Sequence, residues 1–203
     1  KILSKIFFNE TLFINRIKKF KKNLNIHQTQ LMFDLVNKFN IYFKKSLTLE
    51  EYLPKYKIIN SKKNICLLHL SSKWINKYYN EKNFLNLIDI LKNKFDIFLT
   101  SDETTRNKFN LIYKKFPIIK NKDFKNFNKT NGVIIFEYLN FEDWSQLIYC
   151  SNIIITPECG CSHLAAVCKI NSKIIYDPDN KPDMIYAEYS PWQTNHEKFI
   201  FDE

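Results

Sequence analysis

The chain has 203 residues, which is enough for one domain of about 100 to 200 residues with appendages. Its formal net charge is +10, but the lysines are scattered among asparagine, isoleucine and phenylalanine residues, and no nucleic-acid-binding motif accompanies the charge. The composition therefore argues against a dedicated nucleic-acid-binding protein and favours phosphorylated or otherwise anionic partners.

Cysteine usage and hydrophobic runs indicate the compartment. The five cysteines are odd in number and lie mostly in hydrophobic runs, unlike the cysteines of a secreted disulfide framework. No run reaches the roughly 18 apolar residues of a membrane span, and no signal peptide is visible. We therefore expect a protein of the reducing cytosol. The chain begins with Lys1 instead of Met, so we also expect it to be a piece of a longer protein.

The segment before residue 58 is expected to be helical and to lie outside the main domain. Apolar residues at positions 13, 17 and 20 recur at helical spacing beside a basic cluster at 16–22, and a second helix is expected over 28–39. The first helix would pack on a neighbouring domain or, as the less favoured alternative, lie on a membrane surface. Residues 46–57 read as a linker.

From residue 58 onwards, strands and helices are expected to alternate. The expected strands are 64–70, 95–100, 132–136, 153–156 and 172–176, and the expected helices include 80–91, 141–149 and 162–167. A further helix is expected after Ser101 as its N-cap, followed by a loop over 120–130, and the residues after 177 show no clear period. The alternation predicts right-handed βαβ units in an α/β fold with a Rossmann-like, doubly wound parallel sheet.

Polar residues follow the expected strands, where ligands of open parallel sheets bind. Because loops are polar in any protein, the clustering supports a ligand site at this edge without identifying one. The residues are His69, Ser71, Ser72 and Lys73, then Thr100, Ser101, Asp102 and Glu103, then Glu137 and Tyr138, then Glu158 to His163, and finally Asp177.

The stretch Thr156–Val167 reads as strand, tight turn and helix. Gly160 is one of two glycines in the chain, which suggests a backbone with positive φ or a close approach to a ligand. Ser162 and His163 are expected in the first helical turn, where unpaired N–H groups and the helix dipole favour an anion such as phosphate. The alternative is an ordinary strand-to-helix turn with a surface histidine.

Among the lysines, Lys77 is the preferred candidate to reach such a phosphate, and Ser71, Ser72 and Lys73 are secondary candidates. Glu158 would accept hydrogen bonds from sugar hydroxyls or, alternatively, cap the following helix.

Other chemistries find little support in the sequence. Cys159 and Cys161 with His163 lack a second ligand pair at zinc-finger spacing, so no metal is expected. No Walker loop, nucleophile elbow or dinucleotide-binding glycine pattern occurs in the sequence. P-loop phosphoryl transfer and hydride transfer are therefore disfavoured as reactions of this chain.

Three stretches together resemble one known family. They are His69–Phe84 with its Lys-x-aromatic element, Thr100–Glu103, and Leu147–Ala166 with a Gly-x-Ser-His-Leu-Ala-Ala core. They resemble the carboxyl-terminal lobe of the heptosyltransferases, glycosyltransferase family nine, which build the lipopolysaccharide core. The resemblance covers about 28–192 and implies half of a two-lobed GT-B enzyme. It implies that 1–57 is a helical remnant of the amino-terminal lobe with the inter-lobe linker, and that 58–203 is the nucleotide-sugar-binding domain.

Carried over by position, the resemblance also implies donor-binding residues. Lys77 would contact the donor diphosphate, Glu103 would hold the nucleoside, and Glu158 would contact the sugar. The family usually has Asp at the position of Glu158 and Thr or Ser at that of Cys159. The residues that would line the pocket are Cys159, Gly160, Cys161, Ser162 and His163. The general base belongs to the family's amino-terminal lobe, so the resemblance implies that it lies outside this chain.

The resemblance implies an inverting, metal-independent glycosyltransferase without a cofactor. It would transfer a heptose-like sugar from a nucleoside-diphosphate donor, with ADP-heptose as the suggested donor. The acceptor would be a lipopolysaccharide-core or other cell-envelope glycan, in the cytoplasm or at the inner-membrane face. A non-catalytic sugar-nucleotide-binding module is the first alternative. A binder of nucleic acid or anionic membranes acting through the basic amino-terminal helix is the second.

Overall fold

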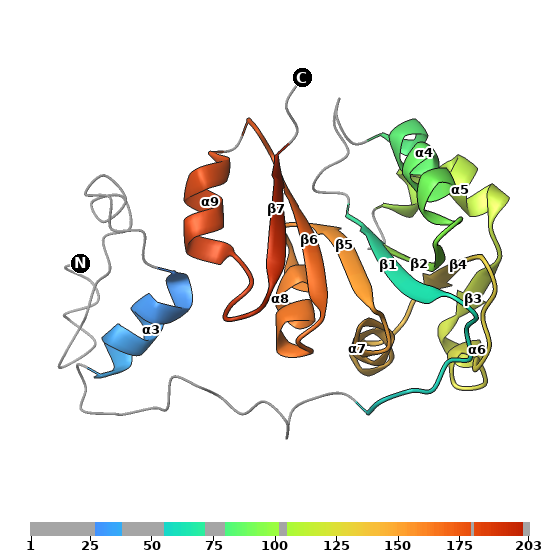
Figure 1. The fold of residues 1–203 in the computed structure, drawn as a ribbon, viewed down its shortest axis with the longest axis horizontal. Coiled ribbons are helices and arrows are strands. Elements are labelled where there is room, and N and C mark those ends of the chain that lie inside the picture. The colour runs from blue at the N-terminus through green and yellow to red at the C-terminus, as the bar shows by residue number, and fades with distance from the viewer. Residues whose placement is uncertain (1–26, 38–54, 72–79, 102–104, 180, 201–203) are drawn as a thin grey trace.

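The computed structural model describes residues 27–37, 55–71, 80–101, 105–179 and 181–200. In this part of the chain, seven strands form one sheet in the order β3-β4-β2-β1-β5-β6-β7, and every neighbouring pair is parallel (Figure 1). The strands are β1 (Asn64–Leu70), β2 (Phe95–Ser101), β3 (Ile118–Lys120), β4 (Val133–Glu137), β5 (Ile153–Pro157), β6 (Asn171–Tyr176) and β7 (His196–Ile200). The predicted α/β fold with a parallel sheet is therefore confirmed.

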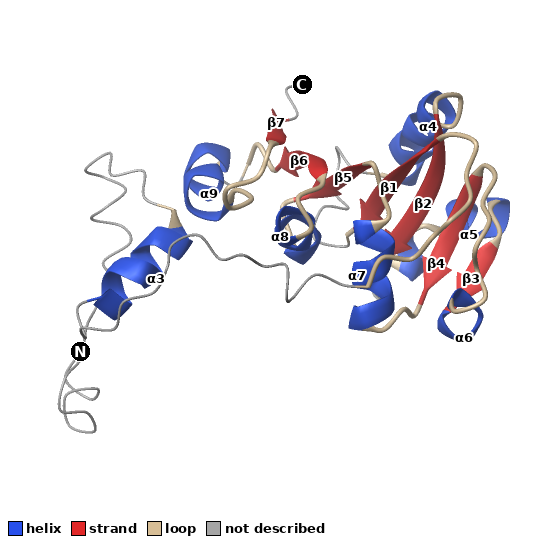
Figure 2. Cartoon of the chain, turned by 60° about the horizontal axis from the view of Figure 1, so that its bottom comes forward, coloured by secondary structure: helices blue, strands red, loops and turns tan. Residues whose placement is uncertain are grey.

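Helices cover both faces of the sheet, as Figure 2 shows. Side chains of α4 and α5 pack into the core cluster on one face, and side chains of α6, α7 and α8 pack into the cluster on the other. The helices are α3 (Gln28–Asn37), α4 (Glu81–Leu91), α5 (Asn110–Lys115), α6 (Asn121–Phe124), α7 (Phe141–Tyr149), α8 (Gly160–Val167) and α9 (Pro182–Tyr189), with the 3₁₀ helix η3 (Arg106–Lys108). The sheet is thus doubly wound.

The burial of the strands follows from their sequences. The central residues of β1 and β2 are apolar and buried on both faces, as is usual for inner strands of a parallel sheet. In β7, by contrast, half-buried and exposed residues alternate, which suits an edge strand with one face toward solvent.

The order of the strands makes β1 the switch point of the sheet. From β1 the chain passes to β2 on one side, and it reaches the other side of β1 when it forms β5. At such a point the loops that follow the two strands run in opposite directions and leave a crevice beyond their carboxyl ends. The carboxyl ends of β1 and β5 therefore border the place where this fold most favours a ligand.

Two expectations about local structure are wrong, and two elements form after residue 177, where the sequence shows no clear period. Ser101 does not cap a helix, because it continues β2 and pairs with Leu70 of β1. The expected loop over 120–130 contains α6, which forms because Phe124 is buried in the core. The residues after 177 form α9 and β7; both are short and mostly half-buried, so their apolar period is weak.

Before residue 55, the structure describes only His27 and α3, which confirms the second helix expected over 28–39 as far as Asn37; residues 38 and 39 lie outside the described residues. His27 Nε2 lies 2.7 Å from the carbonyl oxygen of Ser190, and its ring lies 4.6 Å from that of Trp192. The expected basic helix around 13–20 and most of the expected linker lie outside the described residues. In the described segments, no helix is long and apolar enough to cross a membrane.

Candidate functional site

The turn between β5 and α8 lies at the switch point. The backbone N–H of Glu158 donates to the carbonyl of Ile175 at 3.0 Å, so the pairing with β6 continues into the turn. Cys159 then takes the N-cap position with an extended backbone, and α8 starts at Gly160. The predicted order of strand, tight turn and helix is confirmed, although the helix begins at Gly160 rather than at Ser162.

Gly160 does not use the conformational freedom of glycine. Its φ lies outside the left-handed region because it is the first residue of a helix, and the glycine with positive φ is Gly132, at 95°. The expectation of a positive φ at Gly160 is therefore wrong. A Cβ added to Gly160 would meet no atom outside its own turn within 4 Å, so the backbone there is open to a close approach.

The side chains of Cys161 and Ser162 point into the protein. Cys161 is 1% exposed and packs in the core, while Ser162 is fully buried and its Oγ donates to the carbonyl of Cys159 at 2.7 Å. These positions contribute backbone rather than side chains to the surface of the turn. Glu158 and His163, on either side, are half-buried.

Cys159 and the first turn of α8 differ in how they treat negative charge. Burial raises the pKa of the Cys159 thiol, and this effect outweighs the hydrogen bonds from the Thr156 hydroxyl and the N–H groups of Cys161 and Ser162, so the thiol stays neutral. At the surface of the turn, as at any helix start, the unpaired N–H groups and the positive end of the helix dipole favour an anion. Among the described residues, no group of three or more His, Cys, Asp or Glu side chains is placed to hold a metal ion.

Several expected site residues fall where the structure gives no description. Ser72, Lys73, Lys77 and Glu103 lie outside the described residues, so their roles stay predictions. Ser71, the remaining secondary candidate, follows β1 directly and is buried.

A cavity of about 450 Å³ lies at the carboxyl ends of β1, β2 and β4. It brings together five residues from the expected polar set, and none of the described residues of the β5–α8 turn lines it. The lining comprises His69, Thr100, Ser101, Glu137 and Tyr138 from that set, together with Arg106, Tyr113, Phe136, Leu139, Phe141 and Trp144. The predicted gathering of polar residues at this edge is therefore confirmed.

Hydrogen bonds tie the ends of β1 and β2 together at the cavity. His69 Nδ1 lies 2.9 Å from the hydroxyl of Thr100, and the His69 ring lies 5.7 Å from that of Trp144 on α7. The hydroxyl of Ser101 bonds to that of Tyr113 on α5. Burial raises the pKa of Tyr113, which keeps this phenol neutral.

On the opposite wall, Arg106 joins the polar groups that follow β4. Its guanidinium donates to the hydroxyl of Tyr138 at 2.8 Å and lies 2.8 Å from Oε1 of Glu137. The guanidinium also lies 5.5 Å and 5.9 Å from the ring centroids of Tyr113 and Tyr138. Tyr138 has a φ of 58°, an uncommon backbone conformation that often marks a functional position.

Sequence reasoning did not single out Arg106, Tyr113, Phe141 or Trp144. Arg106 lies in a one-turn 3₁₀ helix without a readable period, among many other basic residues. The three aromatic residues read as ordinary apolar positions of helices, so only the tertiary structure shows that they line a cavity. A signal was present in Glu137 and Tyr138, two polar residues directly after a buried strand.

Comparison of the sequence with known proteins gives no match: no family model matches, and no curated protein matches significantly. Comparison of the fold, by contrast, finds similar solved structures. A glycosyl transferase of family 9 from Veillonella parvula superposes with a TM-score of 0.53 and 11% identity, covering 70% of this chain and 36% of its own. Escherichia coli heptosyltransferase WaaC, solved with ADP, superposes with a TM-score of 0.50 and 14% identity, covering 70% of this chain and 39% of its own.

At these identities, the likeness establishes the fold. The resemblance seen in the sequence is confirmed at that level, because both solved structures are glycosyltransferases of the expected kind. The matched part of this chain spans little more than a third of either protein.

Proposed function

We propose that the chain is the donor-binding part of a glycosyltransferase and holds a nucleoside-diphosphate sugar along the carboxyl edge of its sheet. Two features on that edge support the proposal. The first turn of α8 is open at Gly160, and the start of a helix favours anions, which suits the diphosphate. The cavity beyond β1, β2 and β4 is lined by aromatic residues with a few polar groups, which suits a nucleoside.

The finer part of the proposal follows the sequence resemblance. The sugar would be heptose-like, and the acceptor would be a lipopolysaccharide-core or other cell-envelope glycan at the cytoplasmic face of the membrane. Residues 58–203 would form the donor domain, with 1–57 as the remnant of a first lobe and its linker. In an inverting transfer, the acceptor hydroxyl attacks the anomeric carbon, the bond to the diphosphate breaks, and a base takes the hydroxyl proton. That base would lie outside this chain.

Within the chain, the proposed task is to hold the donor and meet the charge of the departing diphosphate. Lys77 and the N–H groups at the start of α8 would do this, because donors already in place need no reorganisation as the charge develops. His163, one turn into α8, would contact the same phosphates. Glu158 would bind hydroxyls of the sugar, and Glu103 would bind the nucleoside.

Thermal denaturation with a panel of ADP-, GDP- and UDP-sugars tests the proposal. At a hundredfold excess over Kd, a ligand adds about 2.7 kcal/mol of stability, which raises the melting temperature by about 5 °C or more in a chain of this size. We expect such a shift with at least one donor, and we expect Lys77→Ala and His163→Ala to remove it. Lys62→Ala, an exposed lysine before β1 at the opposite edge, is the matched control and should keep it. An unchanged melting temperature across the panel would refute the proposal.

A further inference from the structure

The order of the strands determines which part of a nucleotide each strand end can reach. β4, β2, β1 and β5 are consecutive neighbours, so the end of β4 lies about 14 Å from the end of β5 at the usual strand spacing. With the phosphates at the start of α8, the ribose would lie over β1 and β2. The base, which is the end of the nucleotide farthest from the phosphates, would then meet the residues that end β4.

Glu137, the last residue of β4, offers unused acceptors at this position. It lines the cavity, its side chain is 4% exposed, and neither of its carboxylate oxygens accepts a hydrogen bond from any residue in the described part of the chain. Buried polar groups are nearly always hydrogen-bonded, because an unpaired group has lost its bonds to water. The two oxygens are therefore candidates to accept hydrogen bonds from a ligand.

Arg106 places a donor beside these acceptors. Its Nη1 lies 2.8 Å from Oε1 of Glu137, which is close enough for an ion pair but is not aligned as a hydrogen bond. The Arg106 side chain is 44% exposed, so a ligand can reach its guanidinium, whereas Glu137 is fixed at the end of β4. Together, the pair presents one donor and two acceptors to the cavity.

Among the common bases, guanine satisfies all three groups. Its pairing edge carries the O6 acceptor followed by two donors, N1–H and the 2-amino group. Adenine and cytosine each offer one amino donor next to a ring acceptor, so they leave one oxygen of Glu137 unpaired. Uracil offers one N–H between two carbonyls and places one carbonyl against the carboxylate. A site built for a pair of donors discriminates strongly against ligands that lack one of them.

Aromatic side chains at the cavity provide flat rings on which a base can stack. Tyr138, which is 54% exposed, stands beside Arg106, and Tyr113 lies on the other side of the same guanidinium. Phe141 and Trp144, whose ring centroids are 6.2 Å apart, line the cavity from α7. Stacking on such rings contributes affinity for every base, whereas the edge contacts select among them.

We propose that this cavity binds the guanine base of a nucleoside-diphosphate donor. Glu137 accepts hydrogen bonds from N1–H and the 2-amino group, and Arg106 donates to O6. The inference rests on the proposed function, because it assumes that the phosphates lie at the start of α8. It replaces the adenine nucleotide that the sequence resemblance suggests.

Isothermal titration of the 203-residue chain with GDP, IDP, ADP, UDP and CDP tests the inference. We expect GDP to bind at least about tenfold more tightly than ADP, UDP or CDP, in line with the usual discrimination by a paired base contact. IDP, which lacks only the 2-amino group, should bind about five- to tenfold more weakly than GDP. Glu137→Gln should bring GDP and ADP to within about threefold of each other, since an amide offers one acceptor where the carboxylate offers two. Glu142→Gln removes the same charge at an exposed position of α7 and should leave the preference unchanged.

The outcomes separate this inference from the proposed function. Binding of ADP as tight as that of GDP, or a GDP preference that survives Glu137→Gln, would overturn the guanine assignment and leave the donor site standing. Failure of every nucleoside diphosphate to bind would overturn both. If Glu137→Gln does not fold, as judged by circular dichroism, the comparison of GDP with IDP in the wild-type chain decides.

Discussion

Cys66 lies at the centre of the sheet, and its burial lowers the stability of the folded protein at high pH. It is fully buried in β1, and burial raises the pKa of its thiol from 9.0 to about 12. In the unfolded chain the thiol ionises near the lower value, whereas in the folded protein it keeps its proton up to the higher one. Since the folded state then holds the extra proton, stability is unaffected below pH 9 and falls as the pH rises from 9 to about 12.

We therefore expect the free energy of unfolding to fall more steeply with pH in the wild type than in Cys66→Ala. Between about pH 8.5 and about pH 10.5, the difference between the two proteins should reach about 2 kcal/mol, given about 1.4 kcal/mol per pKa unit. Urea denaturation at the two pH values measures it. The other titrating groups are common to both proteins and cancel, so equal slopes would show that the Cys66 thiol is not shifted.

At the level of single residues, the sequence predicted the edge of the sheet at which polar residues gather better than it predicted which way each side chain points. His69, Thr100 and Glu137 lie at strand ends, and such residues meet at one edge in any parallel sheet. Cys161 was expected to line a pocket, but α8 packs on the sheet through this side chain, so it is buried in the core. The role of Arg106 depends on Glu137, 31 positions later, and sequence patterning does not reveal such a pair.

Among the elements, β1, β2 and β4 are held in register at their amino ends by one carboxylate. Asp96 of β2 is 1% exposed and accepts hydrogen bonds from the Ser61 hydroxyl before β1 and, at 2.7 Å, from the N–H of Gly132 before β4. This carboxylate is satisfied by the fold itself, whereas that of Glu137 at the opposite end of the sheet is not. In our proposal, the contrast distinguishes a carboxylate that supports the scaffold from one that binds a ligand.

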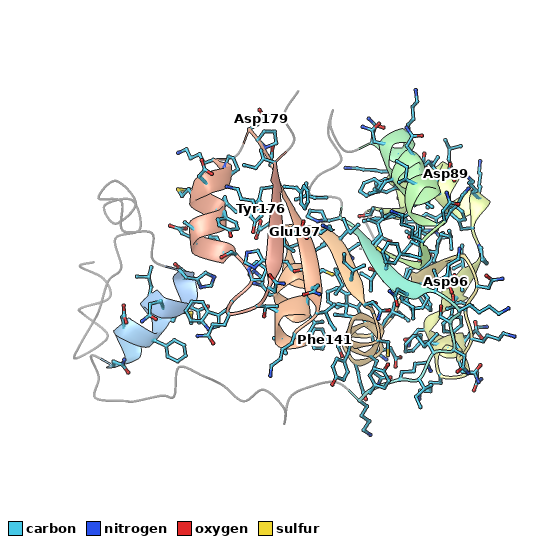
Figure 3. All side chains as sticks on the ribbon, in the orientation of Figure 1. Asp89, Asp96, Phe141, Tyr176, Asp179 and Glu197 are labelled. Carbon is cyan, nitrogen blue, oxygen red and sulfur yellow. The ribbon has the colours of Figure 1, made fainter. Side chains whose placement is uncertain are left out.

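Replacing Asp96 with Ala should lower stability by about 1 to 3 kcal/mol, because it leaves the half-buried N–H of Gly132 without its side-chain acceptor and removes one of the two acceptors of the Ser61 hydroxyl, the other being the carbonyl of Lys63. Asp89→Ala is the matched control: Asp89 lies on α4, is paired with exposed lysines, and should change stability by less than about 1 kcal/mol. Figure 3 labels both aspartates. Urea denaturation measures the two effects. If the Asp96 variant loses nucleotide affinity while keeping its stability, this carboxylate belongs to the site and not to the scaffold.

Elements with a strong period were predicted from the sequence, and short elements were not. β1, β2, β4, β5 and β6 have five to seven residues each, and each contains at least two consecutive apolar residues that are buried in the sheet. β3 and α6 have three and four residues, too few for a period to emerge; β3 forms by pairing with β4, and α6 forms because Phe124 reaches the core. Ser101 resembled a helix cap, but pairing with β1 extends β2 through it.

On the scale of the whole molecule, the scaffold and the proposed site occupy opposite edges of one sheet. Residues such as Asp96 and Gly132 lie at the amino edge, and the cavity and the first turn of α8 lie at the carboxyl edge. The described α/β fold accounts for a place to hold a donor. Since the matched part of this chain spans little more than a third of the two similar glycosyltransferases, we expect it to bind the donor by itself and to need a further lobe for transfer.

Mapping the bound nucleotide by NMR tests the central claim most directly. Titration of the ¹⁵N-labelled chain with GDP should shift the amide signals of Thr100, Tyr138 and Gly160, which lie along the carboxyl edge. The signals of Ile65 and Gly132 at the amino edge should stay in place, because no part of the nucleotide would reach them. If the largest shifts occur at the amino edge or in α3, or if neither GDP nor ADP at saturation shifts any amide signal, the carboxyl edge is not a nucleotide site and the account is wrong.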